Sequence, residues 1–477
     1  MGTTPSHAAA LQEIRSLLGP SGCIDAPAAM QRFLVDHRGL HRGATPFIAC
    51  PADTAQVAAV LAVCHEARIG VVPQGGNTSY CGGATPSAAG DQLVLSLQRL
   101  DRVRAVDAAN FSLVAEAGCV LAYVQAAAES ADRLFPLALG SEGSCQIGGN
   151  LSTNAGGLAA VRYGVARDLV FGLEVVLADG RVIDGLSSLR KDNTGYDLRD
   201  LFIGAEGTLG VITAASLKLF PRPRTVETAF VAVPGMRAAV ELLTRLRSVT
   251  GDCVTTFEYL PRIAVDFVLR HIPGSANPLP ANYPACILCE VSTGREDTQL
   301  RSQLEDALGA AMADGTVLEA AFARSLAQRA AMWRLRESVP DAQRHEGASI
   351  KHDVAVPVAA LPEFLDRAAA AIARVAPAAR LVAYGHVGDG NLHFNLSEPA
   401  GGADRESFLA LQDAIGEAVH ACVRDFRGSI SAEHGIGQLK RGLLARYKDP
   451  VALAAMRAIK AALDPRGIMN PGKVLPD

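Results

Sequence analysis

Residues 140–157 read G-S-E-G-S-C-Q-I-G-G-N-L-S-T-N-A-G-G, and this stretch decides the fold of the first half of the chain. Consecutive glycines let a backbone approach a ligand closely, and small hydroxyl side chains beside them donate to phosphate oxygens without adding bulk. A second stretch of the same character, P-Q-G-G-N-T-S at residues 73–79, follows a short apolar run. The two stretches together suit a pyrophosphate. Ordinary turns are the alternative, because the chain contains 45 glycines.

Two common nucleotide-binding patterns are missing from the sequence. Neither glycine stretch fits G-x-G-x-x-G after a strand, and G-x-x-x-x-G-K-[ST] does not occur. The nicotinamide-binding Rossmann fold and the P-loop fold therefore lose their main support.

Local patterns around these stretches alternate between helix and strand. Asp53 can cap a helix whose apolar positions recur at helical spacing up to Gly70, and residues 173–183 predict a hairpin. Pro221-Arg222-Pro223 breaks the chain after a strand, and we expect a domain boundary there. Beyond it, predicted strands alternate with longer helical stretches, so the second half is also mixed α and β.

Composition limits the class of protein and its compartment. A chain of 477 residues exceeds one ordinary core, and 49% hydrophobic with 20% charged residues is typical of a soluble enzyme. The net charge of −4 and the 5% of aromatic residues argue against a nucleic-acid-binding role. No apolar run reaches the length of a membrane span, and the N-terminus lacks a secretory pattern, so we expect a cytoplasmic protein. The ten cysteines are expected to be reduced thiols.

A second cluster of polar residues lies far along the chain, at residues 384–395, which read Y-G-H-V-G-D-G-N-L-H-F-N. Leu392, Phe394 and Leu396 alternate with polar residues there. A strand would therefore bury the apolar side chains and turn Asn391, His393 and Asn395 to the other face. That polar face suits the floor of an active site.

Two histidines and a carboxylate in this region predict a metal site. His386 and His393 lie seven residues apart, and Glu433 follows some forty residues later in S-A-E-H-G. Imidazole and carboxylate ligands suit a first-row divalent ion, most simply zinc, with manganese or cobalt as alternatives. Three protein ligands leave coordination positions open for substrate. The alternative is that both histidines are ordinary loop residues and that Glu433 caps a helix.

Motifs in both halves resemble one superfamily. P-Q-G-G-N-T-S, the 140–157 stretch, K-D-N-T-G-Y-D-L and I-G-A-E-G-T-L-G-V-I-T, in this order, resemble the FAD-binding domain of the vanillyl-alcohol-oxidase type. H-V-G-D-G-N-L-H-F-N, S-A-E-H-G-I-G and the terminal N-P-G-K resemble its D-2-hydroxy-acid dehydrogenase branch, which contains D-2-hydroxyglutarate, D-lactate and glycolate enzymes. The match runs from about residue 40 to the end.

The resemblance implies an α+β, two-domain flavoprotein. We expect an N-terminal helical segment over residues 1–40 and an FAD-binding domain of two α+β subdomains over 41–221. A mixed α/β substrate or cap domain over 222–432 follows, and C-terminal helices over 433–477 complete the active site.

The same resemblance implies residues that hold FAD. They are Gln74, Gly75, Gly76, Asn77, Thr78 and Ser79 in the first stretch, Gly140, Ser144, Gly148, Gly149, Thr153 and Gly157 in the second, and Glu206, Ile212 and Asn470 elsewhere. Relatives with covalent flavin use a histidine or cysteine near these loops, whereas this chain has Asn77 where the histidine is expected. We therefore predict FAD that is not covalently bound.

The implied reaction is the metal-assisted oxidation of D-2-hydroxyglutarate to the 2-oxo acid. His434, adjacent to a metal ligand but not itself one, is the predicted general base. Arg336 and Lys351 resemble the pair that binds the distal carboxylate of D-2-hydroxyglutarate, and Asn395 is expected to assist at the proximal end. Pro340 stands where some members have a threonine, so D-malate is a second candidate substrate.

Three alternatives remain open at this level. A D-lactate or glycolate dehydrogenase of the same fold differs in whether Arg336 and Lys351 contact substrate, and those two cations could instead be solvated surface charges. A non-catalytic flavin-binding or metal-buffering scaffold would not require the four polar residues His386, His393, Glu433 and His434.

The expected electron acceptor is electron-transfer flavoprotein or a quinone, and a homodimer would fit the family.

Overall fold

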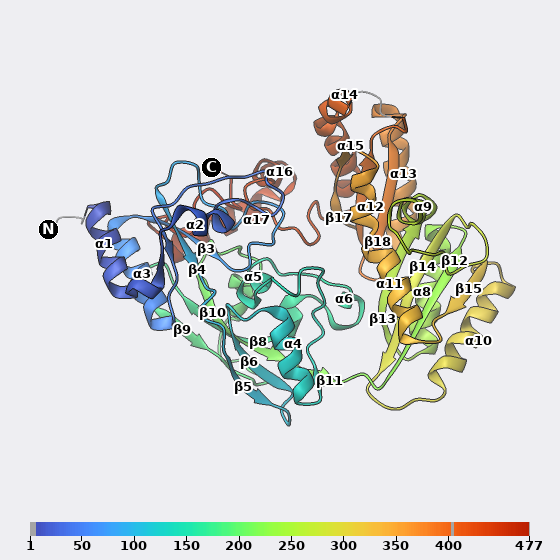
Figure 1. Cartoon of the computed structure of the whole chain (residues 1–477), viewed down its shortest axis with the longest axis horizontal. Helices are drawn as coiled ribbons and strands as arrows, with labels where there is room; N and C mark the ends of the chain where they lie inside the picture. Colours follow the sequence, from blue (N-terminus) through green and yellow to red (C-terminus); the bar gives the residue numbers. More distant parts are fainter. Residues whose placement is uncertain (1–5, 402–404, 477) are drawn as a thin grey trace. The chain divides into compact units, whose positions relative to one another are not determined.

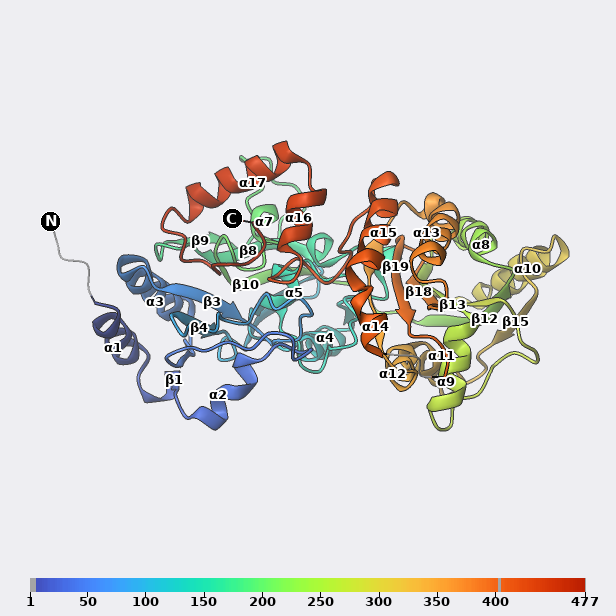
Figure 2. The same cartoon turned by 90° about the horizontal axis from the view of Figure 1, so that it is seen from above.

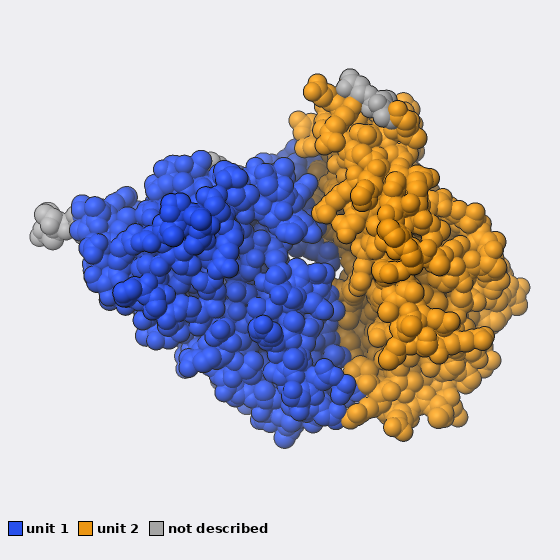
Figure 3. Space-filling model, viewed as in Figure 1, with its two compact units in different colours: residues 1–156, 165–222, 433–477 blue, residues 157–164, 223–432 orange. Residues whose placement is uncertain are grey.

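The computed structural model describes residues 6–401 and 405–476, which fall into two compact units (Figure 3). Unit 1 comprises the chain up to Gly156, Val165–Arg222 and the segment from Glu433 onward. Unit 2 comprises Gly157–Gly164 and Pro223–Ala432. The chain therefore passes from one unit to the other at four places.

Unit 1 contains a small sheet with strand order β1-β2-β4-β3. Figure 1 labels its strands β3 and β4. Strands β2, β4 and β3 are parallel and β1 is antiparallel to β2. The predicted helix capped by Asp53 is confirmed, since its side chain accepts a hydrogen bond from the Gln56 amide. The elements of this part are α1 (His7–Leu18), β1 (Cys23–Ile24), α2 (Pro27–Leu34), β2 (Ile48–Ala49), α3 (Thr54–Ala67), β3 (Gly70–Gln74) and β4 (Gln92–Ser96).

A second sheet of unit 1 is antiparallel throughout, in the order β5-β6-β10-β8-β9. The predicted hairpin over 173–183 is confirmed by the pairing of β8 with β9. This part contains β5 (Val103–Asp107), β6 (Ser112–Glu116), α4 (Leu121–Ser130), β7 (Arg133–Leu134), α5 (Ile147–Ser152), β8 (Val170–Val176), β9 (Val182–Gly185), α7 (Arg199–Phe202), β10 (Val211–Lys218) and β11 (Phe220–Pro221).

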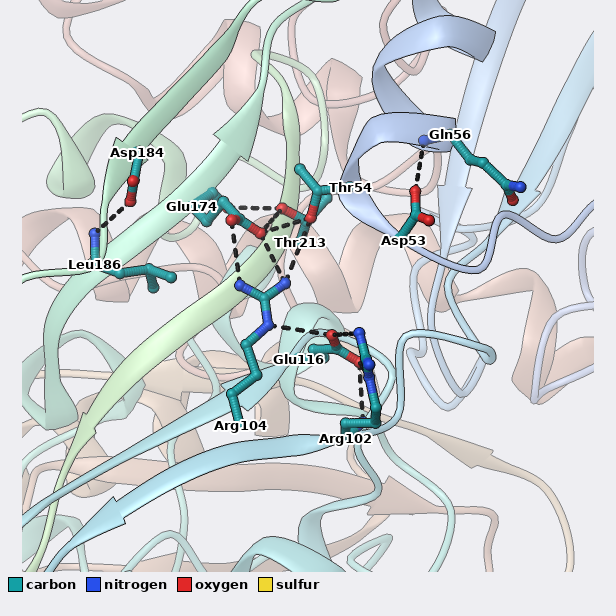
Figure 4. A network of polar contacts seen from close by, with 10 residues as sticks. All are labelled: Asp53, Thr54, Gln56, Arg102, Arg104, Glu116, Glu174, Asp184, Leu186 and Thr213. Atoms are coloured by element: carbon teal, nitrogen blue, oxygen red, sulfur yellow. Dashed lines mark hydrogen bonds and ion pairs between the residues drawn. The ribbon is translucent and has the colours of Figure 1, made fainter. Parts of the chain in front are cut away.

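A partly buried ionic network joins this sheet to the start of α3 (Figure 4). Arg104 Nε donates to Glu116 at 3.1 Å, and Arg104 Nη2 donates to Glu174 at 3.0 Å. The Thr54 hydroxyl donates to the same Glu174 carboxylate at 2.6 Å. Arg102 adds a further bond to Glu116 at 2.9 Å, so two arginines balance two buried or half-buried carboxylates.

The C-terminal segment is built into unit 1. Its helices are α16 (Arg441–Tyr447) and α17 (Pro450–Leu463). The amide of Val71 in β3 donates to Ile468, and the amide of Asn470 donates back to Val71. Lys460 Nζ donates to the carbonyls of Thr208 and Met469, so α17 holds the N-P-G-K end of the chain beside β3.

Unit 2 is built on an antiparallel sheet in the order β15-β12-β14-β13-β18-β19-β16, with β17 also pairing with β19. In β12, side chains alternate between the two faces of the sheet, as the period of a strand requires. In β12, Ala229, Val231 and Val233 pack with α8, α10, α13 and α15, while Phe230 and Ala232 pack with α9, α11 and α12. Figure 2 shows these two helix groups on opposite sides of the sheet.

The bounds of unit 2 follow the chain. They are α6 (Ala160–Tyr163), β12 (Thr225–Val233), α8 (Met236–Val249), β13 (Val254–Pro261), α9 (Arg262–His271), β14 (Ala285–Thr293), α10 (Leu300–Ala313), β15 (Glu319–Phe322), α11 (Leu326–Glu337), α12 (Val339–His345), β16 (Ser349–Ile350), β17 (Asp353–Ala355), α13 (Leu361–Val375), β18 (Arg380–His386), β19 (Asn391–Ser397), α14 (Arg405–Ala410) and α15 (Gln412–Asp425).

One predicted helix is in fact two. The sequence suggests a continuous helix over 333–344, but α11 ends at Glu337 and α12 begins at Val339. Pro340 lies in the first turn of α12, where its missing N–H and fixed φ are tolerated, whereas inside a helix it would break a hydrogen bond.

Candidate active site

The register of three neighbouring strands brings polar side chains to one face of the unit 2 sheet. Leu392, Phe394 and Leu396 of β19 are fully buried in the core on the opposite face, as predicted. Across the sheet, β13 pairs Glu258 with His386, and β18 pairs Tyr384 with His393. Because directly paired residues point to the same side, these four side chains share the face covered by α11 and α12.

Five side chains on this face form a closed ring. Glu258 accepts a hydrogen bond from Arg336 Nε at 2.7 Å and lies 2.7 Å from His386 Nδ1. The imidazole centroids of His386 and His393 lie 5.3 Å apart, and the centroid of His393 lies 5.0 Å from that of the Tyr384 side chain. The Arg336 guanidinium lies 5.1 Å from the Tyr384 ring centre and closes the circle. One predicted substrate cation and two predicted metal ligands are therefore brought together.

Glu258 is the electrostatic centre of this ring, with 1% of its surface exposed. Burial alone would raise its pKa, but the opposing effects of His386 and Arg336 are stronger and lower the pKa to about 2. Its carboxylate is therefore ionised and can only accept hydrogen bonds. Because Nδ1 of His386 faces this carboxylate, any metal ion bound by this histidine would be bound through Nε2.

The predicted cation Lys351 lies at the edge of the same face. The strand pairs that flank it are Ile350 with Leu396 and Asp353 with His393. This register places Lys351 opposite Asn395, so both side chains belong to the polar face. Lys351 is exposed and Asn395 is buried.

Two consecutive hydrogen bonds through Gln343 of α12 hold the side chain of Asn395. Its Nδ2 donates to Gln343 Oε1 at 3.0 Å, and Gln343 Nε2 donates to Ser397 Oγ at 3.0 Å. All three residues are buried. These two bonds restrict the direction of the Asn395 side chain.

Asp353 lies near His393 on the same face of the sheet. Asn391 Nδ2 donates to Asp353 Oδ1 at 2.9 Å, and Asp353 Oδ1 lies 4.0 Å from His393 Nδ1. The backbone amide of Ala432 donates to the carbonyl of the same aspartate at 3.3 Å. Ala432 is the last residue of unit 2, and Glu433 follows it directly in the chain.

Two carboxylates on adjacent strands anchor α11. Arg329 and Arg336 are seven residues apart and so lie on one face of the helix. Arg336 bonds to Glu258 of β13, while Arg329 Nη2 bonds to Glu290 of β14 at 2.8 Å. Trp333 Nε1 also donates to Glu290 at 2.8 Å. Bonds at two points along α11 therefore fix the helix against the sheet, and with it the position of Arg336.

In unit 1 the two predicted glycine stretches touch. A methyl group on Gly76 would lie 2.2 Å from the Ser144 carbonyl oxygen, and one on Gly75 would lie 3.4 Å from Gln146. One on Gly148 would lie 2.7 Å from the Ala117 methyl. These glycines are therefore needed for close packing of the loops themselves.

Other features of the loops fit a polar cofactor. A methyl group on Gly140, Gly143 or Gly149 would meet no atom within 4 Å. Four buried amide atoms of unit 1 lack a hydrogen-bond partner within the described residues: Gln74 Oε1, Gln146 Oε1, Asn150 Nδ2 and Asn470 Oδ1. Unpaired buried polar atoms are costly, so these groups call for an outside donor or acceptor, which the polar edges of FAD can supply.

Glu206 and Asn470 meet at the C-terminal segment of unit 1. Glu206 accepts hydrogen bonds from the backbone N–H groups of Ile436 and Gly437 at 2.7 and 2.9 Å, and Asn470 Nδ2 donates to the Glu206 carbonyl at 2.7 Å. Burial raises the pKa of Glu206 and the two amide bonds oppose that rise. Glu206 thus holds the loop that follows His434.

His434 itself packs against the first glycine stretch. Its ring lies 4.8 Å from that of Tyr80, which directly follows Ser79. The amide of Gln438 donates to the carbonyl of Cys81, so the two loops are also bonded through their backbones. The predicted base is therefore held within unit 1 beside the predicted flavin loops.

The remaining predicted flavin residues lie at scattered points of the fold. Asn77 has a left-handed backbone, and its amide donates to Arg32 and Val35. Ile212 is a buried residue of β10, Thr78 and Ser79 are half-buried, Ser144 is exposed, and Thr153 ends α5. Gly157 belongs to unit 2, unlike the rest of its stretch. Their contact with FAD stays a prediction.

Sequence reasoning missed Glu258, Tyr80 and Gln343. A signal existed for Glu258, because it is a single acid inside the otherwise uncharged strand V-T-T-F-E-Y-L-P. Tyr80 and Gln343 carried no such signal, because an aromatic residue after a loop and a glutamine in a helix are common.

Comparison with known proteins agrees with this architecture. Residues 45–185 match the model of an FAD binding domain, and residues 222–474 match the C-terminal domain of FAD linked oxidases. The chain is 38% identical to a probable mitochondrial D-2-hydroxyglutarate dehydrogenase of Oryza sativa subsp. indica, over 97% of this chain and 81% of that one. It is 39% identical to the mitochondrial enzyme of Danio rerio, over 98% and 85%.

The chain belongs to the FAD-linked D-2-hydroxy-acid dehydrogenases. It is also 33% identical to a D-2-hydroxyglutarate–pyruvate transhydrogenase of Saccharomyces cerevisiae, over 98% of this chain and 94% of that one. The solved structure of p-cresol methylhydroxylase superposes with a TM-score of 0.75 at 16% identity, over 98% and 96%, which shows the shared vanillyl-alcohol-oxidase type fold. This D-2-hydroxy-acid dehydrogenase therefore uses FAD.

The expectation of a cytoplasmic protein is wrong. The plant and fish relatives of this D-2-hydroxy-acid dehydrogenase are named as mitochondrial enzymes. The lack of a long apolar run and of a secretory pattern does not distinguish one aqueous compartment from another, so these two observations could not support the expectation. Within residues 6–401 and 405–476, no helix is both long and apolar enough to cross a membrane.

Proposed function

We propose that this dehydrogenase oxidises D-2-hydroxyglutarate to 2-oxoglutarate, with D-malate as a slower substrate. The observation that carries this proposal is the buried Arg336, placed on the same sheet face as Asn395 and Lys351 and linked through Glu258 to His386. A dicarboxylate needs cations at its far end, and a monocarboxylate does not.

Each polar residue then has one task. Arg336 and Lys351 bind the distal carboxylate, while Asn395, fixed by Gln343, donates to the proximal end. Arg336 bonds to Glu258 through Nε, and in this proposal the outer nitrogens of its planar fork bind a substrate oxygen. His434 accepts the hydroxyl proton on its imidazole as the hydride leaves the adjacent carbon. FAD, when bound, accepts that hydride.

The donor set of unit 2 supports a divalent cation. His386 is bonded through Nδ1, which directs Nε2 outward, and His393 lies edge-on beside it. A zinc, manganese or cobalt ion held by these two and Glu433 would stabilise the negative charge that develops on the hydroxyl oxygen. Glu433 is assigned from its motif and from its place directly after Ala432.

Two alternatives to this proposal concern the substrate and the electron acceptor. A D-lactate or glycolate dehydrogenase would leave Arg336 and Lys351 without a substrate role. The yeast relative is named a transhydrogenase, so a 2-oxo acid such as pyruvate could replace electron-transfer flavoprotein or a quinone as the electron acceptor. Formation of D-lactate from pyruvate, with D-2-hydroxyglutarate as donor and no other acceptor present, would identify that route. A homodimer stays a prediction.

Steady-state kinetics of Lys351→Met test the dicarboxylate proposal. We expect kcat/KM for D-2-hydroxyglutarate to fall about tenfold or more, since a charge-assisted hydrogen bond contributes about 1.5–3 kcal/mol, while D-lactate turnover stays within about twofold. Arg334→Ala is the matched control, because this exposed arginine of α11 bonds to Gly274 instead. Equal losses of kcat/KM for D-2-hydroxyglutarate and D-lactate would exclude the proposed carboxylate clamp, which consists of Arg336 and Lys351.

A further inference from the structure

Glu258 joins two groups that the proposed function uses for different purposes. One carboxylate oxygen lies 2.7 Å from the metal-ligand candidate His386, and the other accepts from the clamp residue Arg336 at 2.7 Å. Their side chains are buried, with 7% of Arg336 and 9% of His386 exposed. The bonds therefore form away from competing water.

We infer that Glu258 is a positioning residue that sets both the His386 tautomer and the direction of Arg336. The inference rests on the proposed function for the roles of those two residues. A carboxylate paired with a guanidinium has only acceptor oxygens, so the proton between Glu258 and His386 belongs to Nδ1. In the neutral imidazole, which is the form that binds a metal ion, Nε2 then carries the lone pair.

The same carboxylate fixes the clamp. A free arginine side chain adopts many rotamers, and holding its Nε at one point restricts where the two terminal nitrogens can lie. Arg336 is bonded at the C-terminal end of α11, two turns from the Glu290–Arg329 pair. Metal binding and recognition of the distal carboxylate are thus coupled through one residue.

Glu258→Gln separates positioning from simple packing. The amide keeps the shape of the side chain but has one oxygen and one NH₂ group. If the oxygen accepts from Arg336, the NH₂ group faces His386 Nδ1, which must then become the acceptor. The His386 proton moves to Nε2, and that nitrogen can no longer bind a metal.

The matched control is Glu290→Gln. Glu290 lies on the neighbouring strand β14, is also buried, and holds the same helix through Arg329 and Trp333. The two substitutions make the same chemical change and disturb the same helix. Only Glu258→Gln changes the hydrogen-bond partner of a predicted metal ligand, His386.

Two measurements on the FAD-loaded, chelator-treated enzyme test the inference. Zinc affinity, measured by competition with a chromophoric chelator, should fall about 10- to 100-fold in Glu258→Gln and stay within about threefold in Glu290→Gln. Long-range proton–nitrogen NMR of histidine-labelled protein should show one histidine changing tautomer, and that signal should be missing in His386→Asn. Glu258→Asp, which keeps both acceptors, should retain the wild-type tautomer and serves if the glutamine variant fails to fold.

The outcomes separate the two proposals. An unchanged His386 tautomer together with unchanged zinc affinity in Glu258→Gln would overturn the positioning role. Wild-type enzyme that takes up no zinc, manganese or cobalt would overturn the proposed metal site, and the NMR spectra would then still decide the role of Glu258.

Discussion

Glu206 accepts a hydrogen bond from the backbone N–H of Ile436 at 2.7 Å, across 230 positions of the chain. A second bond from Gly437 makes the carboxylate a clamp on the loop that follows His434. Gly435 and Gly437 both have positive φ, so this loop has a backbone that few other residues would adopt. The position of the predicted base therefore depends on a side chain distant in sequence.

Glu206→Ala should reduce kcat about tenfold or more, because two backbone amides lose their acceptor and His434 loses its fixed position. Glu206→Gln keeps one carbonyl oxygen as an acceptor, so its kcat should lie between those of Glu206→Ala and the wild type. Flavin content measured by absorbance separates this loss from loss of FAD. Glu66→Ala, an exposed carboxylate in the same unit, is the control. Unchanged kcat at full flavin content would contradict the assigned role of Glu206.

The network of Figure 4 predicts a pH-dependent stability of unit 1. Burial would raise the pKa of Glu116, but hydrogen bonds from Arg102 and Arg104 lower it overall. A carboxyl group with a lowered folded pKa stabilises the protein above its unfolded pKa, and this contribution disappears as the pH falls through the folded value.

Glu116→Gln should therefore lower the melting temperature of the holoenzyme by about 2–4 °C near pH 7. The difference from wild type should shrink as the pH falls below 4.5, the ordinary pKa of the group. Asp184→Asn, an exposed carboxylate on β9 of the same sheet, should change little at either pH. A difference that stays constant with pH would contradict the ionic account.

Two glycine substitutions distinguish loop packing from cofactor contact. Gly76→Ala places a methyl group 2.2 Å from the Ser144 carbonyl and should weaken both folding and FAD binding. Gly149→Ala meets no protein atom within 4 Å, so it should leave the apoprotein stable and weaken FAD binding alone. Fluorescence titration of apoprotein with FAD measures FAD binding in both variants, and thermal melting of the apoprotein measures their folding. Gly309→Ala in α10 is the control. Wild-type affinity in Gly149→Ala would place FAD elsewhere.

The flavin should be released by acid. Asn77 offers no nucleophile, and burial raises the pKa of the Cys145 thiol in the second glycine stretch. Precipitation with acid should leave the yellow colour in the supernatant, with the absorbance spectrum of free FAD. Colour retained in the washed pellet would show a covalent bond.

Sequence patterns predicted the local elements well because helical and strand periods are local properties. The β19 alternation and the helix capped by Asp53 depend only on neighbouring residues. The partners of Arg336 could not be predicted in the same way. Glu258 lies 78 positions earlier, and their contact depends on the order of strands in the sheet.

The candidate site shows the same division. Motifs indicated His386, His393 and Asn395 individually, but pairing of β13 with β18 was needed to bring Glu258 beside His386. The expected contact of Glu206 with the cofactor stays a prediction, and its bonds to the loop after His434 were not foreseen. The single helix expected over 333–344 was wrong because the effect of Pro340 on the helix was overlooked.

Anaerobic reduction of the flavin tests the central claim most directly. Metal-replete enzyme is mixed in a stopped-flow instrument with D-2-hydroxyglutarate, D-malate or D-lactate, and bleaching of the flavin absorbance is followed with and without prior chelation. The account predicts fast bleaching by D-2-hydroxyglutarate, slower bleaching by D-malate, and loss of both on chelation. Preferential bleaching by D-lactate, or rates that chelation does not change, would contradict it.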